Sequence, residues 1–285
     1  MKYIASSDLP LLEALTHLSP QSSKNTLRSW IKEGRVQVND IPIKNPSFIV
    51  VKDQCVTVGQ RKKIIRPGIP LLYEDRDLVI IEKPAGLLSV ATAFEKEETA
   101  HALLKAHYRP HQVYVVHRLD QETSGVMVFA LNQATYEQLK ALFEVHAIER
   151  AYTAIVEGHF SQPAGTWQSY QYEDPQYRVH ETQDQTQGRL AITHFRTITY
   201  SKRYTWLELQ LETGRKNQIR VHCQSAGHSI VGDKKYGAQS NPLKRLCLHA
   251  HLLAFQHPFT KKKLCFESPV PEEFYRLFPS SLTAL

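Results

Sequence analysis

The chain has 285 residues, of which 42% are hydrophobic and 22% charged, which is ordinary for a soluble globular protein with one large and one small domain. Its four cysteines are far apart and form no C-x-x-C pair, which argues against a disulfide framework and a zinc finger and favours the reducing cytoplasm. The sequence shows neither a secretory leader nor a run of about 18 apolar residues, so we expect no export and no membrane partner.

Positive charge is concentrated in the N-terminal quarter. The formal net charge is +7, and residues 1–70 contribute +6 of it through 11 lysines and arginines against 5 acidic residues. A local excess of this kind is typical of a module that binds a polyanion. The sequence therefore predicts a small basic domain, residues 1–60, then a Gly-, Pro- and Lys/Arg-rich linker, residues 61–71, and a large domain, residues 72–285.

The small domain begins with helices and continues with strands. Apolar residues recur at helical spacing over residues 9–18 and again over 25–33, where Gly34 caps the second helix. Strand-like alternation follows between residues 36 and 58. Five cations are predicted on or beside the second helix: Lys24, Arg28, Lys32, Arg35 and Lys44. Evenly spaced cations are usually the solvated face of a helix, so the pattern alone leaves RNA contact open.

The stretch LRSWIKEGRVQVNDIPI, residues 27–43, resembles the S-four domain, a small RNA-binding module named after a ribosomal protein. The resemblance implies a small α+β domain at the N-terminus. It also implies that the cations of the second helix contact RNA, namely Lys24, Arg28, Lys32 and Arg35.

The large domain mixes strands and helices. A strand over residues 78–82 runs into the turn from Lys83 to Gly86, and helices are predicted over 98–108 and 132–144. Residues 161–190 show little periodicity and predict an irregular excursion. Further strands are predicted over residues 149–158, 191–199 and 206–211.

The most informative stretch is His117 to Gly125, which reads HRLDQETSG. Apolar runs over residues 113–116 and 126–130 flank it, so we expect a polar turn that joins two buried strands and holds Asp120. Hydroxyl side chains and a glycine near its end can fold the backbone back. The pattern alone leaves open a surface loop with a solvated pair of Arg118 and Asp120.

This stretch resembles the catalytic motif of the RluA-type pseudouridine synthases, in which the Asp is the essential residue. A second match is TGRKNQIRVH, residues 213–222, where the family usually reads TGRTHQIRVH, so Lys216 and Asn217 depart from the pattern. The resemblance implies an α+β catalytic domain with a central mixed, mostly antiparallel sheet flanked by helices, and a cleft across the sheet.

The resemblance also implies which residues form the site. Asp120 is expected to be the catalytic carboxylate, Arg220 to pair with it, and Tyr152 to stack on the uracil and help to move its proton. Arg118 is expected to replace the flipped uridine in the RNA stack. Three further residues are expected to border the substrate: Lys83, Arg215 and Asn217.

Conversion of uridine to pseudouridine detaches the base nitrogen from ribose and rejoins the sugar to a ring carbon, so no atoms are gained or lost and we expect no cofactor. Asp120 could attack the sugar, stabilise positive charge on it or remove a ribose proton, and the sequence leaves these routes open. Cys247, His249 and His251 share one predicted strand face, but no further ligand is suitably spaced, so we expect no metal.

Two functions of other classes compete with this interpretation. If the chain were a catalytically silent RNA-binding protein, its intact catalytic motifs would be unexplained. A nucleoside or glycosyl hydrolase needs a second carboxylate to activate water. We therefore expect an RNA pseudouridine synthase that acts on large-subunit ribosomal RNA, transfer RNA or both. We also expect a cytoplasmic monomer without an obligate protein partner.

Overall fold

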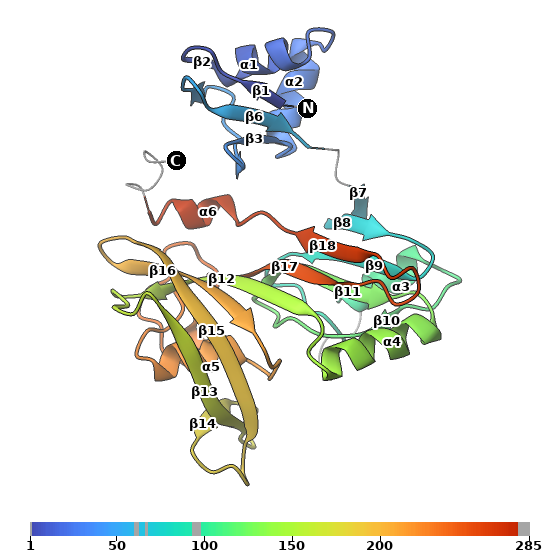
Figure 1. The fold of residues 1–285 in the computed structure, drawn as a ribbon, viewed down its shortest axis with the longest axis vertical. Helices are drawn as coiled ribbons and strands as arrows, with labels where there is room; N and C mark the ends of the chain where they lie inside the picture. Colours follow the sequence, from blue (N-terminus) through green and yellow to red (C-terminus); the bar gives the residue numbers. More distant parts are fainter. Residues whose placement is uncertain (1, 60–62, 66–67, 93–97, 279–285) are drawn as a thin grey trace. The chain divides into compact units, whose positions relative to one another are not determined.

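The computed structural model describes residues 2–59, 63–65, 68–92 and 98–278. The chain divides into two units between residues 62 and 63, close to the expected boundary (Figure 1). None of the helices in the described part has the length and apolar character needed to cross a membrane.

The N-terminal unit packs two helices against short antiparallel strands. The helices are α1 (Leu11–Leu18) and α2 (Lys24–Lys32). The strands are β1 (Lys2–Ile4), β2 (Leu9–Pro10), β3 (Val36–Val38), β4 (Ile41–Pro42), β5 (Ile49–Val50) and β6 (Cys55–Val58), paired in the orders β1-β6-β3-β4 and β2-β5. The Ser23 hydroxyl caps α2 by accepting from the Thr26 N–H, and Gly34 (φ +68°) ends it, as the sequence predicts.

The second unit is built on one large sheet. Its described strands are β7 (Lys63–Ile65), β8 (Ile69–Glu74), β9 (Leu78–Lys83), β10 (Tyr114–Val115), β11 (Ser124–Ala130), β12 (Glu149–Glu157), β13 (Ala164–Glu173), β14 (Val179–Thr182), β15 (Arg189–Tyr200), β16 (Tyr204–Leu211), β17 (Leu248–Gln256) and β18 (Lys263–Glu267). They run in the order β14-β13-β15-β16-β12-β17-β11-β9-β8-β7, with β10 beside β11 and β18 beside β17. Among the described strands, β11 and β17 are parallel and every other pair is antiparallel, so the expected mixed, mostly antiparallel sheet is confirmed.

Helices flank this sheet. They are α3 (Ala100–His107), α4 (Gln133–Glu144), α5 (Gln218–Ser225), the 3-10 turn η1 (Lys234–Tyr236) and α6 (Glu272–Tyr275). Helix α4 packs on β10 and β11, and α5 packs on β14 and β15 (Figure 1). On one side of α4, Leu139 is buried, and Tyr136, Leu142 and Phe143 pack against the same apolar cluster.

The segment expected to be a linker is mostly part of the sheet. Lys63 pairs with Leu71, and Ile65 pairs with Ile69, so β7 and β8 form a hairpin. Ile65 and Ile69 are buried in the main core. In the sequence, basic and turn-forming neighbours hide the strand pattern of these two residues. Linker positions 61–62 and 66–67 lie outside the described residues.

Residues 161–190 are not the irregular excursion that their composition predicts, because β13 and β14 form within them. The buried side of β13 includes the polar Ser169 and Gln171, so apolar alternation is missing from the sequence. Ser169 lies 3.0 Å from the His222 ring nitrogen on α5, which satisfies one of these polar groups inside the unit.

Gly125 permits the one parallel strand contact described in the sheet. Its φ is +121°, and a Cβ atom built there would lie 2.1 Å from the carbonyl oxygen of Ala250 on β17. Only glycine combines this backbone angle with so close an approach of two strands. The loop that precedes Gly125 is thereby held beside β17.

We expect Gly125→Ala to lower the free energy of unfolding by at least about 3 kcal/mol, because the methyl group adds both strain and overlap. Gly227→Ala is the matched control, since Gly227 has φ +80° but open space around its Cβ position, and it should cost only about 1 kcal/mol. Denaturant unfolding of both variants measures the difference. Similar losses in the two variants would show that the strand contact adds nothing beyond backbone strain.

Candidate active site

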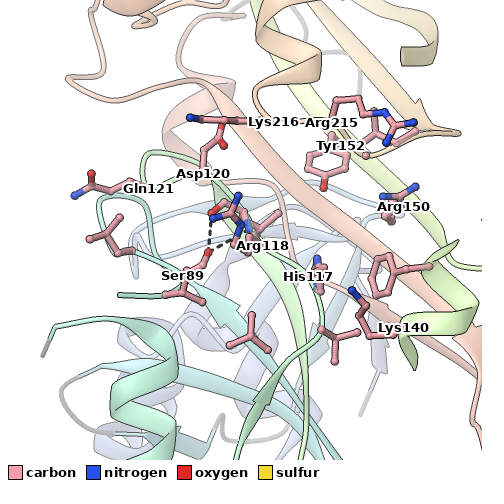
Figure 2. A pocket seen from close by; sticks show the side chains of 18 of the residues that line it. Ser89, His117, Arg118, Asp120, Gln121, Lys140, Arg150, Tyr152, Arg215 and Lys216 are labelled. Atoms are coloured by element: carbon pink, nitrogen blue, oxygen red, sulfur yellow. Dashed lines mark hydrogen bonds between the residues drawn. The ribbon is translucent and has the colours of Figure 1, made fainter. Parts of the chain in front are cut away.

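The loop that carries Asp120 lies between two paired strands, as the sequence predicts. β10 and β11 pair in antiparallel fashion, with Val115 opposite Phe129. The Ser89 hydroxyl fastens the loop by donating to the Leu119 carbonyl at 2.6 Å and accepting from the Leu119 N–H at 3.1 Å (Figure 2). Leu119 is buried, and these two bonds hold its backbone in place. They therefore also fix the backbone of the next residue, Asp120, which lines the cleft.

Lys83 supports this loop and does not line the cleft, which corrects the expectation drawn from the family resemblance. Its side chain is buried, and its ammonium group donates to the carbonyls of Pro84, Leu87 and Gln121 at 3.0, 2.7 and 3.0 Å. These three bonds use all of its N–H groups. Burial lowers the pKa of Lys83 to about 7, against the attraction of nearby Asp120.

Asp120 forms the expected ion pair with Arg220, and a second carboxylate holds that arginine in place. The Arg220 Nη1 lies 3.2 Å from Asp120 Oδ2, while its Nε and Nη2 donate to the two oxygens of Asp233 at 2.7 and 2.8 Å. Asp233 is buried, and the guanidinium lies over the Tyr236 ring at 5.0 Å. Burial opposes ionisation, but the bonds and charge of Asp233 outweigh it and raise the pKa of Arg220.

Asn217 contacts the carboxylate of Asp120 and lines the recess beside it. It is buried in the left-handed conformation (φ 54°) just before α5. With its amide oxygen accepting from the Tyr236 hydroxyl at 2.9 Å, its NH2 group donates to Asp120 Oδ2 at 2.7 Å and Oδ1 at 3.1 Å. The opposite orientation would point a carbonyl oxygen at a carboxylate. Asn217 thus helps to hold the carboxylate of Asp120 in place.

The turn before α5 is fixed by Gln218. Its side-chain oxygen accepts from the Thr213 hydroxyl at 2.8 Å and from the Arg215 N–H at 2.9 Å, and its NH2 group donates to Ile192 and Thr193 of β15. Arg215 remains at the surface of the cleft, with its Nε bonded to the carbonyl of Leu190. The same turn therefore positions both Arg215 and the start of α5.

The loop and the turn face a cleft of about 800 Å³, which adjoins a recess of about 60 Å³. Asp120, Tyr152, Arg118 and Arg215 line both spaces, and Arg220 lines the recess (Figure 2). Burial raises the pKa of Tyr152 to about 12, so its phenol is neutral at physiological pH. The cleft thus combines one carboxylate with a flat neutral ring and several cations.

The four cations expected to bind RNA in the N-terminal unit do not behave alike. Lys24, Arg28 and Lys32 are exposed and four residues apart on one side of α2. Arg35 is instead half-buried: its guanidinium lies over the Trp30 ring at 5.0 Å and 3.7 Å from Glu33, and its Nε donates to a backbone carbonyl at 3.0 Å. Arg35 is thus engaged within the unit, whereas the other three cations are exposed.

Two members of the metal-like row of Cys247, His249 and His251 have structural roles. One ring nitrogen of His249 lies 2.8 Å from the Ser124 hydroxyl and the other 3.3 Å from the Ser268 carbonyl. Burial raises the pKa of Cys247 to about 12, which keeps it a thiol. His249 is thus engaged by hydrogen bonds, Cys247 is protonated, and the Nε2 of His251 lies 4.0 Å from a carboxylate oxygen of Glu208.

A second group, Asp75, Asp77 and His257, is close enough to hold an ion but is internally satisfied. One His257 nitrogen accepts from the N–H groups of Phe259 and Thr260, and the other donates to Asp75 at 3.1 Å. This arrangement leaves no lone pair of the ring for a metal. The group therefore joins two turns of the sheet by hydrogen bonds.

The family models match both units of the chain. The RNA pseudouridylate synthase model matches residues 77–225, more than half of the chain, and the S4 domain model matches residues 9–58. The chain belongs to the RNA pseudouridylate synthase family. It is accordingly an isomerase that converts uridine to pseudouridine in RNA, as the sequence motifs indicate.

Curated relatives extend this similarity over nearly the whole chain. An uncharacterized RNA pseudouridine synthase of Bacillus subtilis strain 168 is 34% identical over 90% of this chain and 88% of its own length. Ribosomal large subunit pseudouridine synthase D of Neisseria meningitidis serogroup B is 32% identical over 92% and 76%, and that of Escherichia coli K12 is 30% identical over 93% and 88%.

A solved structure shares the fold. Human RNA Pseudouridylate Synthase Domain Containing 1 superposes with a TM-score of 0.61 at 22% identity, over 72% of this chain and 86% of that one. The expected fold class is confirmed.

Sequence reasoning missed Asp233 and Tyr236, which orient Arg220 and Asn217. Both lie in GDKKYG between α5 and β17, where no periodicity or repeated residue type marks them. One signal could have found Asp233: it is a lone acidic residue two positions after the apolar pair Ile230-Val231. A buried arginine requires a nearby counter-charge, and Asp233 was a candidate for it. Ser89 was missed because its role depends on the backbone of a distant loop.

His117 of the catalytic loop offers a pH test of the site. Its Nε2 accepts from the Val128 N–H at 3.1 Å and its ring stacks on Phe143, while loss of hydration and the charge of Arg150 lower its pKa to about 3. The unfolded chain, with a pKa near 6.5, therefore binds more protons between pH 6.5 and 3. Folding stability must fall as the pH drops through this range.

We expect the wild-type chain to lose about 1–2 kcal/mol more than His117→Gln between pH 7.5 and 5.0, because glutamine keeps an acceptor but does not titrate. Denaturant unfolding at the two pH values measures this. Equal losses in both proteins would mean that His117 titrates normally in the folded state.

Proposed function

We propose that this enzyme isomerises specific uridines of large-subunit ribosomal RNA. The similarity to ribosomal large subunit pseudouridine synthases of Neisseria meningitidis and Escherichia coli, over more than nine-tenths of the chain, supports this RNA class. The exposed cations on α2 of the S4 unit support binding of structured RNA. We further propose that the enzyme works in the cytoplasm as a monomer.

The observation that carries the catalytic proposal is the setting of Asp120 in the cleft. Arg220 and Asn217 both donate to its carboxylate, which fixes the direction of the carboxylate before RNA binds. An ionised carboxylate can attack the anomeric carbon, stabilise positive charge on the sugar or remove a ribose proton. We assign one of these steps to Asp120.

The other residues of the cleft fit roles in binding the flipped nucleotide. Tyr152 offers a neutral ring on which uracil can stack, next to the same recess as Asp120. Arg118 is exposed at the cleft, so its planar guanidinium can occupy the gap that the flipped uridine leaves in the RNA. Arg215, at the cleft surface, is suited to a phosphate contact.

We expect Asp120→Asn to abolish pseudouridine formation, with a loss of at least about a thousand-fold, while folding and RNA affinity persist. The variant should fold because Asp233 still neutralises Arg220. The experiment adds each protein to total RNA from a strain lacking the gene and maps pseudouridine by reverse transcription after selective chemical modification. Activity retained by the variant would exclude Asp120 as the catalytic group.

The same map decides the RNA class, because modification confined to transfer RNA would contradict the ribosomal target. Release of free uracil would indicate a hydrolase. RNA binding without either product would indicate a silent binding protein.

We expect replacement of Lys24, Arg28 and Lys32 by glutamine to weaken RNA binding while leaving the saturated rate unchanged. Each lost phosphate contact reduces the slope of log affinity against log salt by roughly 0.7–0.9. The matched control replaces Lys261, Lys262 and Lys263, three exposed lysines at the end of the β17–β18 turn and the start of β18, and removes the same charge from the other unit. Equal slopes for the two triple variants would show that the α2 cations have no special role.

A further inference from the structure

Arg150 is a buried arginine of the cleft that has no counter-charge. It lies on β12, two residues before Tyr152, and is only 8% exposed. Within the described part of the chain its guanidinium forms no ion pair, and its single hydrogen bond runs from Nη2 to the carbonyl of Glu212 at 3.1 Å. Its buried Nε has no hydrogen-bond partner.

Arg150 contrasts with Arg220, the other buried arginine of the site. Arg220 contacts two carboxylates, whereas the neighbours of Arg150 are a backbone carbonyl and the ring of Phe143 at 5.6 Å. Burial without an anion lowers the pKa of Arg150 from its ordinary value, opposite to the shift of Arg220. An unpaired buried charge costs several kcal/mol, so such a residue usually meets an anion that the free protein lacks.

The surroundings of Arg150 keep its guanidinium beside open space. It lines the 800 Å³ cleft together with Tyr152 and Lys140 (Figure 2). Gly214, in the turn before α5, makes room for it, because a Cβ atom there would lie 2.5 Å from Arg150 Nη1. The guanidinium of Arg150 therefore fits in the wall of the cleft.

We propose that Arg150 binds a backbone phosphate adjacent to the target uridine. RNA is the substrate of this enzyme, and its phosphates are the anions that it brings into the cleft. The guanidinium fork matches phosphate oxygens, and in a site shielded from water such a bond is stronger than one made by a surface lysine. The inference rests on the proposal that the uridine enters the cleft beside Asp120.

The position of Arg150 on β12 indicates which phosphate it takes. Residues two apart on a strand point to the same face and lie roughly 7 Å apart. The spacing between Arg150 and Tyr152, the proposed stacking partner of the uracil, is therefore similar to the distance between a base and a phosphate of the same nucleotide. A phosphate flanking the flipped nucleotide fits this spacing better than one in the surrounding helix.

The test combines Arg150→Met with neutral phosphates in the RNA. The substrate is the shortest fragment around the mapped uridine that the wild-type enzyme modifies, prepared with a single methylphosphonate at each position from two nucleotides before the uridine to two after it. Affinity and single-turnover rate are measured for every combination. Arg203→Met is the matched control, because Arg203 is exposed on the β15–β16 turn and does not line the cleft.

We expect Arg150→Met to weaken RNA affinity by about 10- to 100-fold and to change the saturated rate less. One flanking methylphosphonate should cause a similar loss in the wild-type enzyme and no further loss in Arg150→Met. Arg150→Lys should restore part of the affinity, and Arg203→Met should keep it.

Other results would show that Arg150 does not bind a phosphate. If every methylphosphonate weakens the wild type and Arg150→Met equally, or if Arg150→Met loses only thermal stability, Arg150 is a packing residue and the inference is wrong. If Arg150→Met does not fold, the same comparison is made with Arg150→Lys, whose loss at the critical phosphate must be smaller than that of the wild type. Failure of the wild-type enzyme to modify the RNA overturns the proposed target instead.

Discussion

The bidentate bond between Asp233 and Arg220 is the interaction on which the catalytic geometry depends. Asp233 is buried, so it holds the guanidinium at two points and leaves the remaining nitrogen to reach Asp120 at 3.2 Å. Asn217 donates to the same carboxylate from another direction and is itself fixed by Tyr236. One positive charge thus contacts two carboxylates, and the side chain of Asp120 is held in one orientation. Because these groups are already in place, they need little further movement when charge develops in the transition state.

The loop that carries Asp120 is held by contacts of a different kind. Ser89 bonds both backbone groups of Leu119, and the ammonium group of Lys83 gathers carbonyls from the loop and from the turn after β9. Gly125 lets the end of the loop pass directly against β17. These contacts involve the backbone, so they fix the path of the loop while leaving its polar side chains free to face RNA. A site supported in this way by strands is more exact than one on a free loop.

The arginines of the cleft differ in how their charges are compensated, and this difference predicts their roles. Arg220 has two carboxylate partners and therefore acts on the protein itself. Arg118 and Arg215 lie at the cleft in contact with solvent, where charge attracts RNA at little cost. Arg150 is buried without an anion, which reserves it for a group that the substrate supplies.

The sequence by itself determined the two-part organisation, the family, the strands on either side of the catalytic loop and the identity of Asp120 and its partner, because these depend on local periodicity and on contiguous motifs. Only the tertiary structure decided that Lys83 is buried, that Arg35 packs on Trp30, that Asn217 contacts Asp120, and that β13 and β14 form. Asn217 and Asp120 are distant in the sequence, and neither the two-residue nor the 3.6-residue period reports a polar contact between distant parts of a chain. Whether a charged residue binds a ligand or the protein depends on which groups surround it after folding.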